Sequence, residues 1–364
     1  MTEQTFIEEE GIKVPFFSEK ISKELPVFYN PAMKLNRDTT LLVLKTYFKD
    51  RTIKACDPMC ATGIREMRLL KTIPEVFDKF VCGDISRTAI DQLVENFKLN
   101  DISTCKLELK AQNAINTLAE QYYDYIEVDP FGSPVPFLDI ACQRIKSKGL
   151  LSVTATDTAA LCGTYPKTSL RKYGIKMSKT LWYEELGLRN LIAYCQRIAA
   201  QYEKNITPIL SYTDNHYYKI FFKVENQRTK ALQDIKNQKY IEWDKKTQRI
   251  DIKDLETKDS IGKTFIGNYC DKEFISSLLS QISLISDKKQ CEKLLTKLLA
   301  EPQTVGHYDP YKFCKELDFQ HTKSYEDIFA KVKELGYEIA RAHNSDFGIK
   351  TNCPVEKVIE ILKN

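Results

Sequence analysis

The 364-residue chain lacks the residue patterns that a structural metal, a disulfide framework or a membrane span requires. Its eleven cysteines are odd in number and include no CxxC pair, and its four histidines are scattered, so we expect no metal. No apolar run is long enough to cross a membrane, and the N-terminal MTEQTFIEEEGIK lacks the apolar core of a signal peptide. These absences favour an intracellular protein with reduced thiols, cytoplasmic or, in a eukaryote, nuclear.

A strong net charge is also missing, but basic residues are concentrated in one stretch. The formal net charge is +4, which is too small to indicate nucleic-acid binding by itself. Residues 165–179, YPKTSLRKYGIKMSK, nevertheless contain five basic residues and no acidic residue. This stretch is a candidate for contacts to phosphates, and the alternative is a solvated loop.

Residues 34–224 alternate strand-like and helix-like patterns, which predicts a parallel α/β sheet. A turn signal, TDN, then separates two further β-rich stretches and predicts a terminal hairpin. Five alternating strands closed by such a hairpin are typical of an α/β, class I methyltransferase (Rossmann-like) doubly wound sheet, although another doubly wound fold has the same pattern. The strand-like segments are TIKACDP, KFVCGDIS, KLELKA, YDYIEVDP, GLLSVTATD, ITPILSY and HYYKIFFKV.

The pattern changes after Val224. The following residues are highly charged and contain two short strand-like pieces, YIEW and RIDI, before several helix-like runs. We therefore predict a catalytic domain over residues 1–224 and a smaller α+β C-terminal domain over residues 225–364.

Polar residues follow the first three predicted strands, where doubly wound sheets bind ligands. The turn after the first strand contains only Gly63, so the GxGxxG dinucleotide fingerprint is absent and a ligand without phosphate there, such as S-adenosylmethionine, fits better. Arg65 begins the next helix and could bind a carboxylate, or be a solvated helix residue. Asp84 could accept ribose hydroxyls, or cap a helix. Asn113 and Ala114 stand where an adenine edge would be read.

The segment EVDPFGSPVPFLD, residues 127–139, can neither continue a strand nor begin a helix at once, because its prolines lack backbone donors. An enzyme that methylates an exocyclic amine needs an acceptor for each N–H and an aromatic plane for the base. The carboxylate of Asp129, the carbonyl of Pro130 and the ring of Phe131 offer these groups, much like the acid/amide-Pro-Pro-aromatic motif of amino methyltransferases. The alternative is a rigid turn that packs Phe131 into the core.

Six motifs occur in an order that resembles one known family, the tRNA (guanine(26)-N2)-dimethyltransferases. The resemblance implies transfer of two methyl groups from S-adenosyl-L-methionine to N2 of guanine 26 of tRNA. The motifs are VFYNPAMKLNRD (27–38), ATGIR (61–65), DPFGSP (129–134), VTATDTAALCGTYPK (153–167), LRKYG (170–174) and GIKT (348–351).

The resemblance also assigns roles to residues. It implies that Phe28 closes on the flipped base. The chain departs from the family by having Asn113 where an acid is common, and HNSDFG where HFSPTG is frequent. The implied catalytic motif is Asp129, Pro130 and Phe131, and the implied cofactor contacts are Arg37, Arg65, Asp84, Asn113 and Ala114.

A base in a stacked junction must be flipped to reach Asp129, so the tRNA must be held elsewhere by its phosphates. We expect Lys167, Arg171 and Lys172 to make such contacts, while the C-terminal domain binds tRNA by shape or buttresses the catalytic domain. Alternatives are an amino methyltransferase for another nucleobase and a catalytically idle tRNA-binding protein. Binding alone would need neither Asp84 nor Asp129. A dehydrogenase is disfavoured because the glycine fingerprint is absent.

Overall fold

The structure is a computed structural model, which describes residues 6–15, 29–214, 216–320 and 323–363. Phe28 lies outside the described residues. The chain forms two compact units. The first comprises residues 1–155, 221–226 and 276–293, and the second comprises residues 156–220, 227–275 and 294–364. These units do not coincide with the predicted ranges 1–224 and 225–364, whose catalytic and tRNA-binding roles remain a prediction.

A seven-stranded sheet has the strand order β5-β4-β3-β6-β7-β9-β8, which confirms the predicted doubly wound sheet with a terminal hairpin. The five strands from β3 to β7 pair in parallel. Thr213 and Asp214, predicted to lie in the turn, are the last two residues of β8 instead. The strands are β3 (Ile53–Asp57), β4 (Phe77–Asp84), β5 (Leu107–Ala111), β6 (Tyr123–Val128), β7 (Ile145–Ala155), β8 (Lys204–Asp214) and β9 (Tyr217–Asn226).

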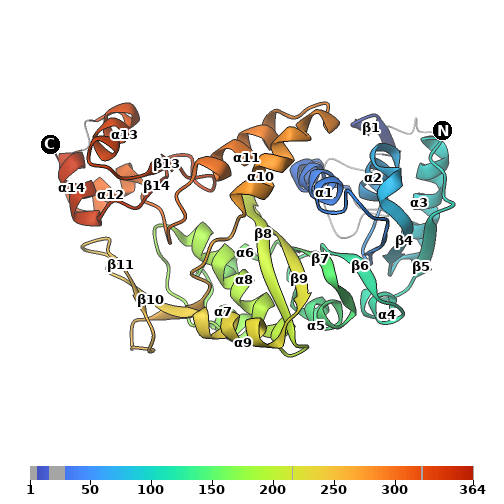
Figure 1. Ribbon diagram of the computed structural model, residues 1–364, viewed down its shortest axis with the longest axis horizontal. Coiled ribbons are helices and arrows are strands. Elements are labelled where there is room, and N and C mark those ends of the chain that lie inside the picture. The colour runs from blue at the N-terminus through green and yellow to red at the C-terminus, as the bar shows by residue number, and fades with distance from the viewer. Residues whose placement is uncertain (1–5, 16–28, 215, 321–322, 364) are drawn as a thin grey trace. The chain divides into compact units, whose positions relative to one another are not determined.

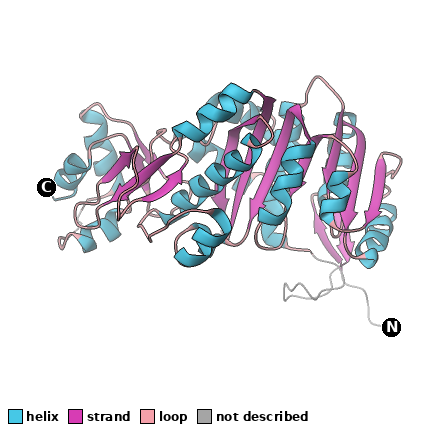
Figure 2. Cartoon of the chain, turned by 90° about the horizontal axis from the view of Figure 1, so that it is seen from below, coloured by secondary structure: helices cyan, strands magenta, loops and turns pink. Residues whose placement is uncertain are grey.

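Helices connect the parallel strands and pack on the sheet (Figure 2). The turn from β3 into the next helix depends on Gly63, whose φ of +74° is left-handed and whose added Cβ would lie 2.7 Å from Cγ of Leu93. The turn can therefore pass close to the neighbouring helix. The helices of the first unit include α1 (Lys34–Tyr47), α2 (Ile64–Thr72), α3 (Arg87–Leu99), α4 (Ala114–Ala119) and α5 (Val135–Arg144), with 3-10 turns at Pro31–Met33, Pro74–Val76 and Ile282–Leu284.

An N-terminal hairpin of β1 (Phe6–Glu9) and β2 (Ile12–Pro15) carries a buried carboxylate into the first unit. Oε1 of Glu9 accepts hydrogen bonds from Nε of Arg37 and from Arg68, both at 2.7 Å. Arg68 also pairs with Asp38 of α1. Burial alone would raise the pKa of Glu9, but Arg37 and Arg68 lower it from 4.5 to about 2. The charge network thus joins the hairpin to α1 and α2.

The second unit contains a three-stranded sheet of order β11-β10-β12 and a terminal group of small elements. The pieces YIEW and RIDI lie in β10 and β11, which pair antiparallel as predicted strands should. The elements that lie wholly in this unit include β10 (Lys239–Trp243), β11 (Ile250–Lys253), β12 (Ile261–Thr264), α6 (Thr158–Leu161), α7 (Pro166–Tyr173), α8 (Tyr183–Ala200) and α9 (Arg228–Asn237). Two further helices, α10 (Lys272–Ser280) and α11 (Lys289–Ala300), have residues in both units.

Residues 308–363, drawn in red near the C-terminus in Figure 1, are here called the C-terminal module. They have a hydrophobic core of their own. Phe313, Ile328, Ile349 and Val358 are buried completely in it. The α+β character predicted for this part of the chain is confirmed by its elements. These are α12 (Pro310–Glu316), α13 (Tyr325–Glu334), α14 (Val355–Lys363) and the antiparallel pair β13 (Ile339–Arg341) and β14 (Ile349–Thr351).

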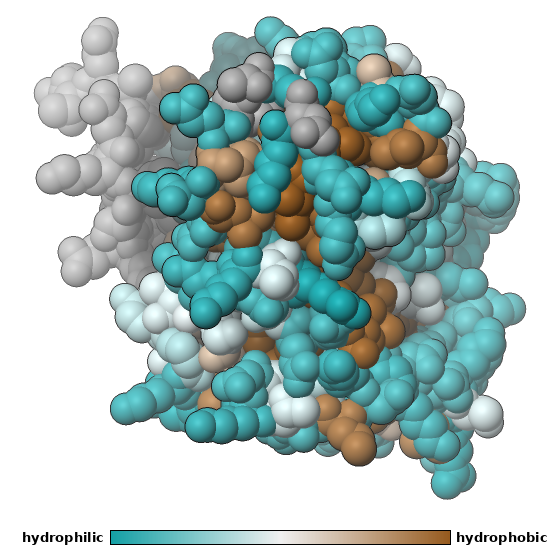
Figure 3. Space-filling model, turned by 90° about the vertical axis from the view of Figure 1, so that its left-hand side faces the viewer, coloured by the Kyte–Doolittle hydropathy of each residue, from teal (hydrophilic) through white to brown (hydrophobic). Residues whose placement is uncertain are grey.

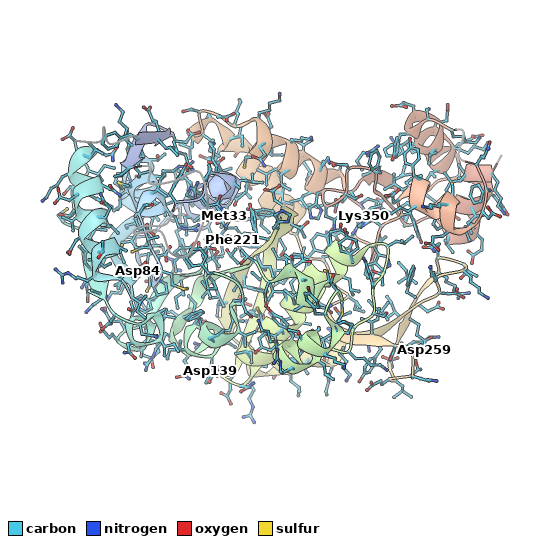
Figure 4. All side chains as sticks on the ribbon, turned by 180° about the vertical axis from the view of Figure 1, so that it is seen from behind. Met33, Asp84, Asp139, Phe221, Asp259 and Lys350 are labelled. Atoms are coloured by element: carbon cyan, nitrogen blue, oxygen red, sulfur yellow. The ribbon has the colours of Figure 1, made fainter. Side chains whose placement is uncertain are left out.

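The GIKT motif places a buried lysine in the second unit (Figure 4). The Lys350 ammonium group donates to Glu185 of α8 at 3.0 Å and to the carbonyl of Thr304 at 2.9 Å. Burial raises the pKa of Glu185, but Lys350 and Arg189 outweigh it and hold that pKa well below its ordinary value. This motif therefore anchors β14 to α8.

We predict that Glu9→Gln removes an acid-sensitive contribution to stability. Because the folded pKa of Glu9 is below its unfolded value, its contribution is present above about pH 4.5 and is lost as the pH falls toward 2. The shift corresponds to about 3 kcal/mol at neutral pH. Urea unfolding between pH 7 and pH 3 should show the variant least stable relative to wild type at pH 7, with the gap closing in acid.

Glu75→Gln is the matched control, because Glu75 is paired with Lys45 but its side chain is 56% exposed. An exposed pair contributes about 1 kcal/mol or less, so that variant should follow the wild-type pH profile. A gap between Glu9→Gln and wild type that stays constant with pH would contradict the role assigned to the Glu9 charge.

Candidate active site

Three acidic residues lie at one edge of the parallel sheet, where the strands end. Asp57 ends β3, Asp84 ends β4, and Asp129 follows β6. Asp57 is 2% exposed, and the Asp129 side chain is 14% exposed. Because the carboxyl ends of parallel strands meet at one edge, the sheet forms a polar rim, as the sequence predicts.

Arg65, in the first turn of α2, is the cation at the centre of this rim. Its Nε lies 3.4 Å from Asp57, another guanidinium nitrogen lies 3.2 Å from Glu127, and the third pairs with Asp129. Burial lowers the pKa of Arg65, but the carboxylates outweigh burial and raise that pKa well above its ordinary value. Arg65 is therefore a permanent cation that holds Asp129 in place.

Arg65 was predicted to receive a ligand carboxylate or to be a solvated helix residue. The second alternative is wrong, because Arg65 is only 8% exposed. It also donates to Asn36 at 2.8 Å and to Thr40 at 3.2 Å, both in α1. A ligand carboxylate would share nitrogens that already have partners, so the predicted contact remains a prediction.

The rim carries more negative than positive charge. The pKa of Asp57 is raised to about 6. Burial and the nearby Glu127 raise it, and Arg65 only partly offsets them. Burial and then the neighbouring Asp57 raise the pKa of Glu66 well above its ordinary value. Burial thus favours the neutral form of Glu66. The acids that pair with Arg65, namely Asp57, Glu127 and Asp129, outnumber this one cation, and an excess of acids suits a cationic ligand.

Asp84, labelled in Figure 4, keeps accepting capacity for a ligand. Its two oxygens accept from the backbone N–H groups of Ser86 at 2.8 Å and Ala61 at 3.2 Å. A carboxylate has about four acceptor sites, so about two remain. The side chain of Ser86, not Asp84, caps α3 by accepting from Ala89. The alternative that Asp84 is the helix cap is therefore wrong.

Asn113 and Ala114 lie beyond β5, next to the end of β4. The Asn113 amide oxygen caps α4 by accepting from the N–H of Ile115 at 2.8 Å, while Ala114 is buried. Our prediction gave the Asn113 amide group no capping role, but its oxygen is used to cap α4. Its Nδ2 makes no hydrogen bond within the described part of the chain, and this leaves a donor for a ligand.

Two apolar residues at this edge were missed from the sequence. Ile85 follows Asp84 and is 76% exposed, and Ile115 follows Ala114 and is 41% exposed. A polar strand-end residue followed by an exposed aliphatic side chain suits a flat apolar ring with a polar edge. This adjacency was the available signal in the sequence.

The motif after β6 presents its aromatic ring outward. Phe131 is 50% exposed, Pro130 is buried, and Gly132 has a left-handed φ of +90° before α5 begins at Val135. The alternative that Phe131 packs into the core is therefore wrong. A fixed carboxylate, a fixed carbonyl and an exposed ring follow one another at the sheet edge, as hydrogen bonding and stacking of a base require.

Arg37, assigned to the cofactor by resemblance alone, is 6% exposed and bound to Glu9 through two nitrogens. It also donates to the carbonyl of Asn30 at 3.1 Å. For the residues that the structure describes, no hydrogen bond involves its remaining terminal nitrogen, which is the group left for a ligand. Its role in cofactor binding remains a prediction.

Part of the basic stretch in the second unit, residues 166–173, forms the helix α7, so the alternative of a solvated loop is wrong for that part. Pro166 begins α7 and Gly174 ends it in a left-handed conformation, both typical of helix ends. Lys167 and Arg171 are exposed one turn apart. Lys172 is half-buried and pairs with Asp157 at 3.2 Å, so it is less available for phosphates than predicted.

Other classes of site are absent from the described residues. Between Phe6 and Lys363, apart from the stretches left undescribed, no group of three His, Cys, Asp or Glu side chains could hold a metal ion. Within the same ranges no helix is both long and apolar enough for a membrane span. All eleven cysteines are free, and only Cys105 is exposed.

The chain matches known proteins along nearly its whole length. The family model described as N2,N2-dimethylguanosine tRNA methyltransferase matches residues 8–363. The tRNA (guanine(26)-N(2))-dimethyltransferase of Methanobrevibacter smithii is 34% identical over 375 residues, which cover 98% of this chain and 96% of that protein. The tRNA (guanine(26)-N(2)/guanine(27)-N(2))-dimethyltransferase of Aquifex aeolicus is 34% identical over 377 residues, which cover 97% and 95%. The structure of Trm1 from Pyrococcus horikoshii with S-adenosyl-L-methionine matches with a TM-score of 0.91 and 31% identity, over 99% of this chain and 100% of that chain.

Proposed function

Because the chain belongs to the N2,N2-dimethylguanosine tRNA methyltransferase family, we propose that it transfers one and then a second methyl group from S-adenosyl-L-methionine to N2 of guanine 26 of tRNA. The observation that carries the proposal is that an exposed ring, Phe131, follows closely after Asp129 at the polar edge of the sheet. Arg65 holds the Asp129 carboxylate there through an ion pair. Position 27 is the second candidate, since the Aquifex aeolicus relative is named for both guanines.

The residues at the rim fit S-adenosyl-L-methionine, which supplies a methyl group on a positively charged sulfonium when bound. The negative charge around Arg65 suits that cation, and Asp84 can accept from the ribose hydroxyls. Ile85 and Ile115 would contact the adenine, whose edge Asn113 and Ala114 would face. Arg37 and Arg65 would bind the carboxylate.

Asp129 and Pro130 orient the acceptor amine. The Asp129 carboxylate accepts one N–H of N2, the Pro130 carbonyl accepts the other, and Phe131 stacks on the base. An exocyclic arylamine is a weak base, so these contacts contribute mainly by directing the nitrogen lone pair out of the ring conjugation. Each transfer would form one N–C bond, break the bond between the methyl group and the sulfonium sulfur, and release one proton from N2, which Asp129 would accept.

In the second methyl transfer, fewer hydrogen bonds can orient N2. After the first methylation N2 has one N–H left, so only one of the two acceptors at Asp129 and Pro130 can be used. Weakening the acceptor that the remaining N–H uses should therefore impair the second transfer more than the first.

The two parts of the chain have different tasks in this proposal. Residues 1–224 carry out the methyl transfer, and residues 225–364 help to bind tRNA. Phe28 would close on the flipped guanine, and Lys167 and Arg171 would contact phosphates, with Lys172 a weaker contributor because of its ion pair with Asp157. An intracellular location fits a tRNA substrate and the free thiols.

The reaction predicts a defined product. Purified protein, incubated with unmodified tRNA transcripts and S-adenosyl-L-methionine, should yield N2-methylguanosine and then N2,N2-dimethylguanosine by mass spectrometry of the digested nucleosides. Fragment analysis should place them at guanine 26. Asp129→Ala should reduce the rate about 100-fold or more, because the amine loses its charged acceptor.

Asp139→Ala is the matched control, because Asp139 is an exposed acid on α5 in the same segment (Figure 4). It should retain the wild-type rate. Absence of methylated guanosine with wild-type protein that binds both tRNA and cofactor would contradict the proposed activity. Methylation of adenine instead of guanine would favour the alternative, an amino methyltransferase for another nucleobase.

Asn113→Asp should tighten cofactor binding. The Asp carboxylate would still cap α4 and would add an acceptor for the adenine amine, for which the Asn oxygen is already used. One added hydrogen bond corresponds to about 1 kcal/mol, or roughly fivefold in affinity. Calorimetric titration with S-adenosyl-L-homocysteine measures this without turnover. Equal or weaker binding would contradict adenine recognition at this position.

The exposed face of α7 predicts a salt-dependent contribution to tRNA binding. The Lys167→Gln, Arg171→Gln double variant should reduce the slope of log K against log salt concentration by roughly one unit per residue. Lys172→Gln should change the slope less, because Lys172 is paired with Asp157. Filter binding over a salt series measures all three slopes, and an unchanged slope in the double variant would remove α7 from the phosphate contacts.

A further inference from the structure

Three aromatic rings adjoin one another on the C-terminal module. The ring centroids of Tyr311 and Phe347 are 5.5 Å apart and nearly perpendicular, and those of Tyr311 and Tyr325 are 6.3 Å apart. The rings come from α12, from α13 and from the loop between β13 and β14. The C-terminal module therefore brings residues distant in sequence together into one group, here called the aromatic cluster (Tyr311, Tyr325 and Phe347).

Two members of the aromatic cluster are more exposed than buried. Tyr311 is 52% exposed and Phe347 is 53% exposed, while the hydrophobic core of the module is formed by other residues. Figure 3 views the molecule from the side where α12, α13 and α14 lie in Figure 1, and hydrophobic side chains interrupt a mostly hydrophilic surface there. Adjoining exposed rings at a surface are typical of a binding site.

The backbone around these rings is held by hydrogen bonds. The Tyr325 hydroxyl donates to the carbonyl of Phe347 at 2.8 Å. Asp309 caps α12 by accepting from the N–H groups of Tyr311 and Lys312, both at 3.1 Å. The rings are therefore presented from anchored segments, which lowers the entropy cost of binding a flat partner.

Cations and acids both flank the aromatic cluster, and several of the acids are already paired, including Asp309, which lies 3.5 Å from the ammonium group of Lys312. The Arg341 guanidinium carbon lies 3.8 Å from the centroid of the Tyr325 ring, a cation–π contact. Lys312 and Lys315 are exposed on α12, and Lys315 is one turn from Tyr311. Of the acids at the two ends of α12, Asp309 is buried as the cap and Glu316 pairs with Lys245 at 3.3 Å.

We propose that the aromatic cluster binds an unpaired, splayed-out nucleobase of tRNA. One of the two perpendicular rings, Tyr311 or Phe347, stacks on the face of the base and the other contacts its edge, while Arg341, Lys312 and Lys315 contact the base or its phosphates. Aromatic rings combined with a guanidinium plane and lysines are the groups that recognise bases in RNA loops and ends. This inference rests on the proposed tRNA substrate. In this proposal, the C-terminal module holds tRNA by stacking on one of its bases.

Tyr311→Leu and Phe347→Leu test the stacking, because leucine keeps an apolar side chain of similar volume but removes the ring. Equilibrium binding of an unmodified tRNA transcript, measured by filter binding without cofactor, should weaken roughly tenfold for each variant. The slope of log K against log salt should not change, because stacking releases no counterions. Tyr311→Phe should retain wild-type affinity.

Leu335→Ala is the matched control, since Leu335 is 43% exposed on the same module but is not in the aromatic cluster. Chemical probing of bound tRNA should show one loop or end base protected by wild type and reactive with the Leu variants. If both Leu variants bind tRNA within twofold of wild type, the proposal is overturned, and the cluster becomes a protein-binding surface. If the wild-type protein binds tRNA and methylates it while the Leu variants show no change, the proposed function is unaffected.

Discussion

The active site depends on the ion pairs of Arg65 with carboxylates from two neighbouring strands. Asp57 ends β3, Glu127 lies in β6, and Asp129 follows it, so one guanidinium joins the two strands at their carboxyl ends. Three acids so close together could not all remain ionised in a buried site without that cation. The same arrangement leaves excess negative charge for a sulfonium ligand and fixes the carboxylate that would accept the amine proton. If Arg65 also binds the cofactor, as proposed, cofactor binding and base orientation would be linked through one residue.

The strand segments, the strand ends and the motif at Asp129 could be predicted from the sequence, because each depends on local pattern. The role of Arg65 could not, since its partners come from different strands and only the fold brings them together. The hairpin that carries Glu9 was missed because its short strands are specified by burial of the charge against Arg37 and Arg68. Ile85 and Ile115 were missed because sequence patterns show that they are apolar but do not show that they are exposed.

For the basic stretch, the sequence shows how many side chains are basic but not how many of them are available to bind phosphates. Residues 165–179 contain five basic side chains, but Lys172 pairs with Asp157 and Lys176 donates to backbone carbonyls of Thr257 and Lys258. Lys167 and Arg171 remain as exposed cations on α7. Affinity for tRNA would thus combine a few exposed cations with base stacking on the C-terminal module.

The measurement that tests the central claim most directly is a double-mutant cycle of Arg65→Lys and Asp129→Asn on the rate of methyl transfer, at saturating cofactor and tRNA. If Arg65 acts by holding Asp129, the double variant should be about as slow as Asp129→Asn alone, with a coupling energy above about 1 kcal/mol. Effects that simply multiply would contradict the account, because Arg65 and Asp129 would then contribute independently.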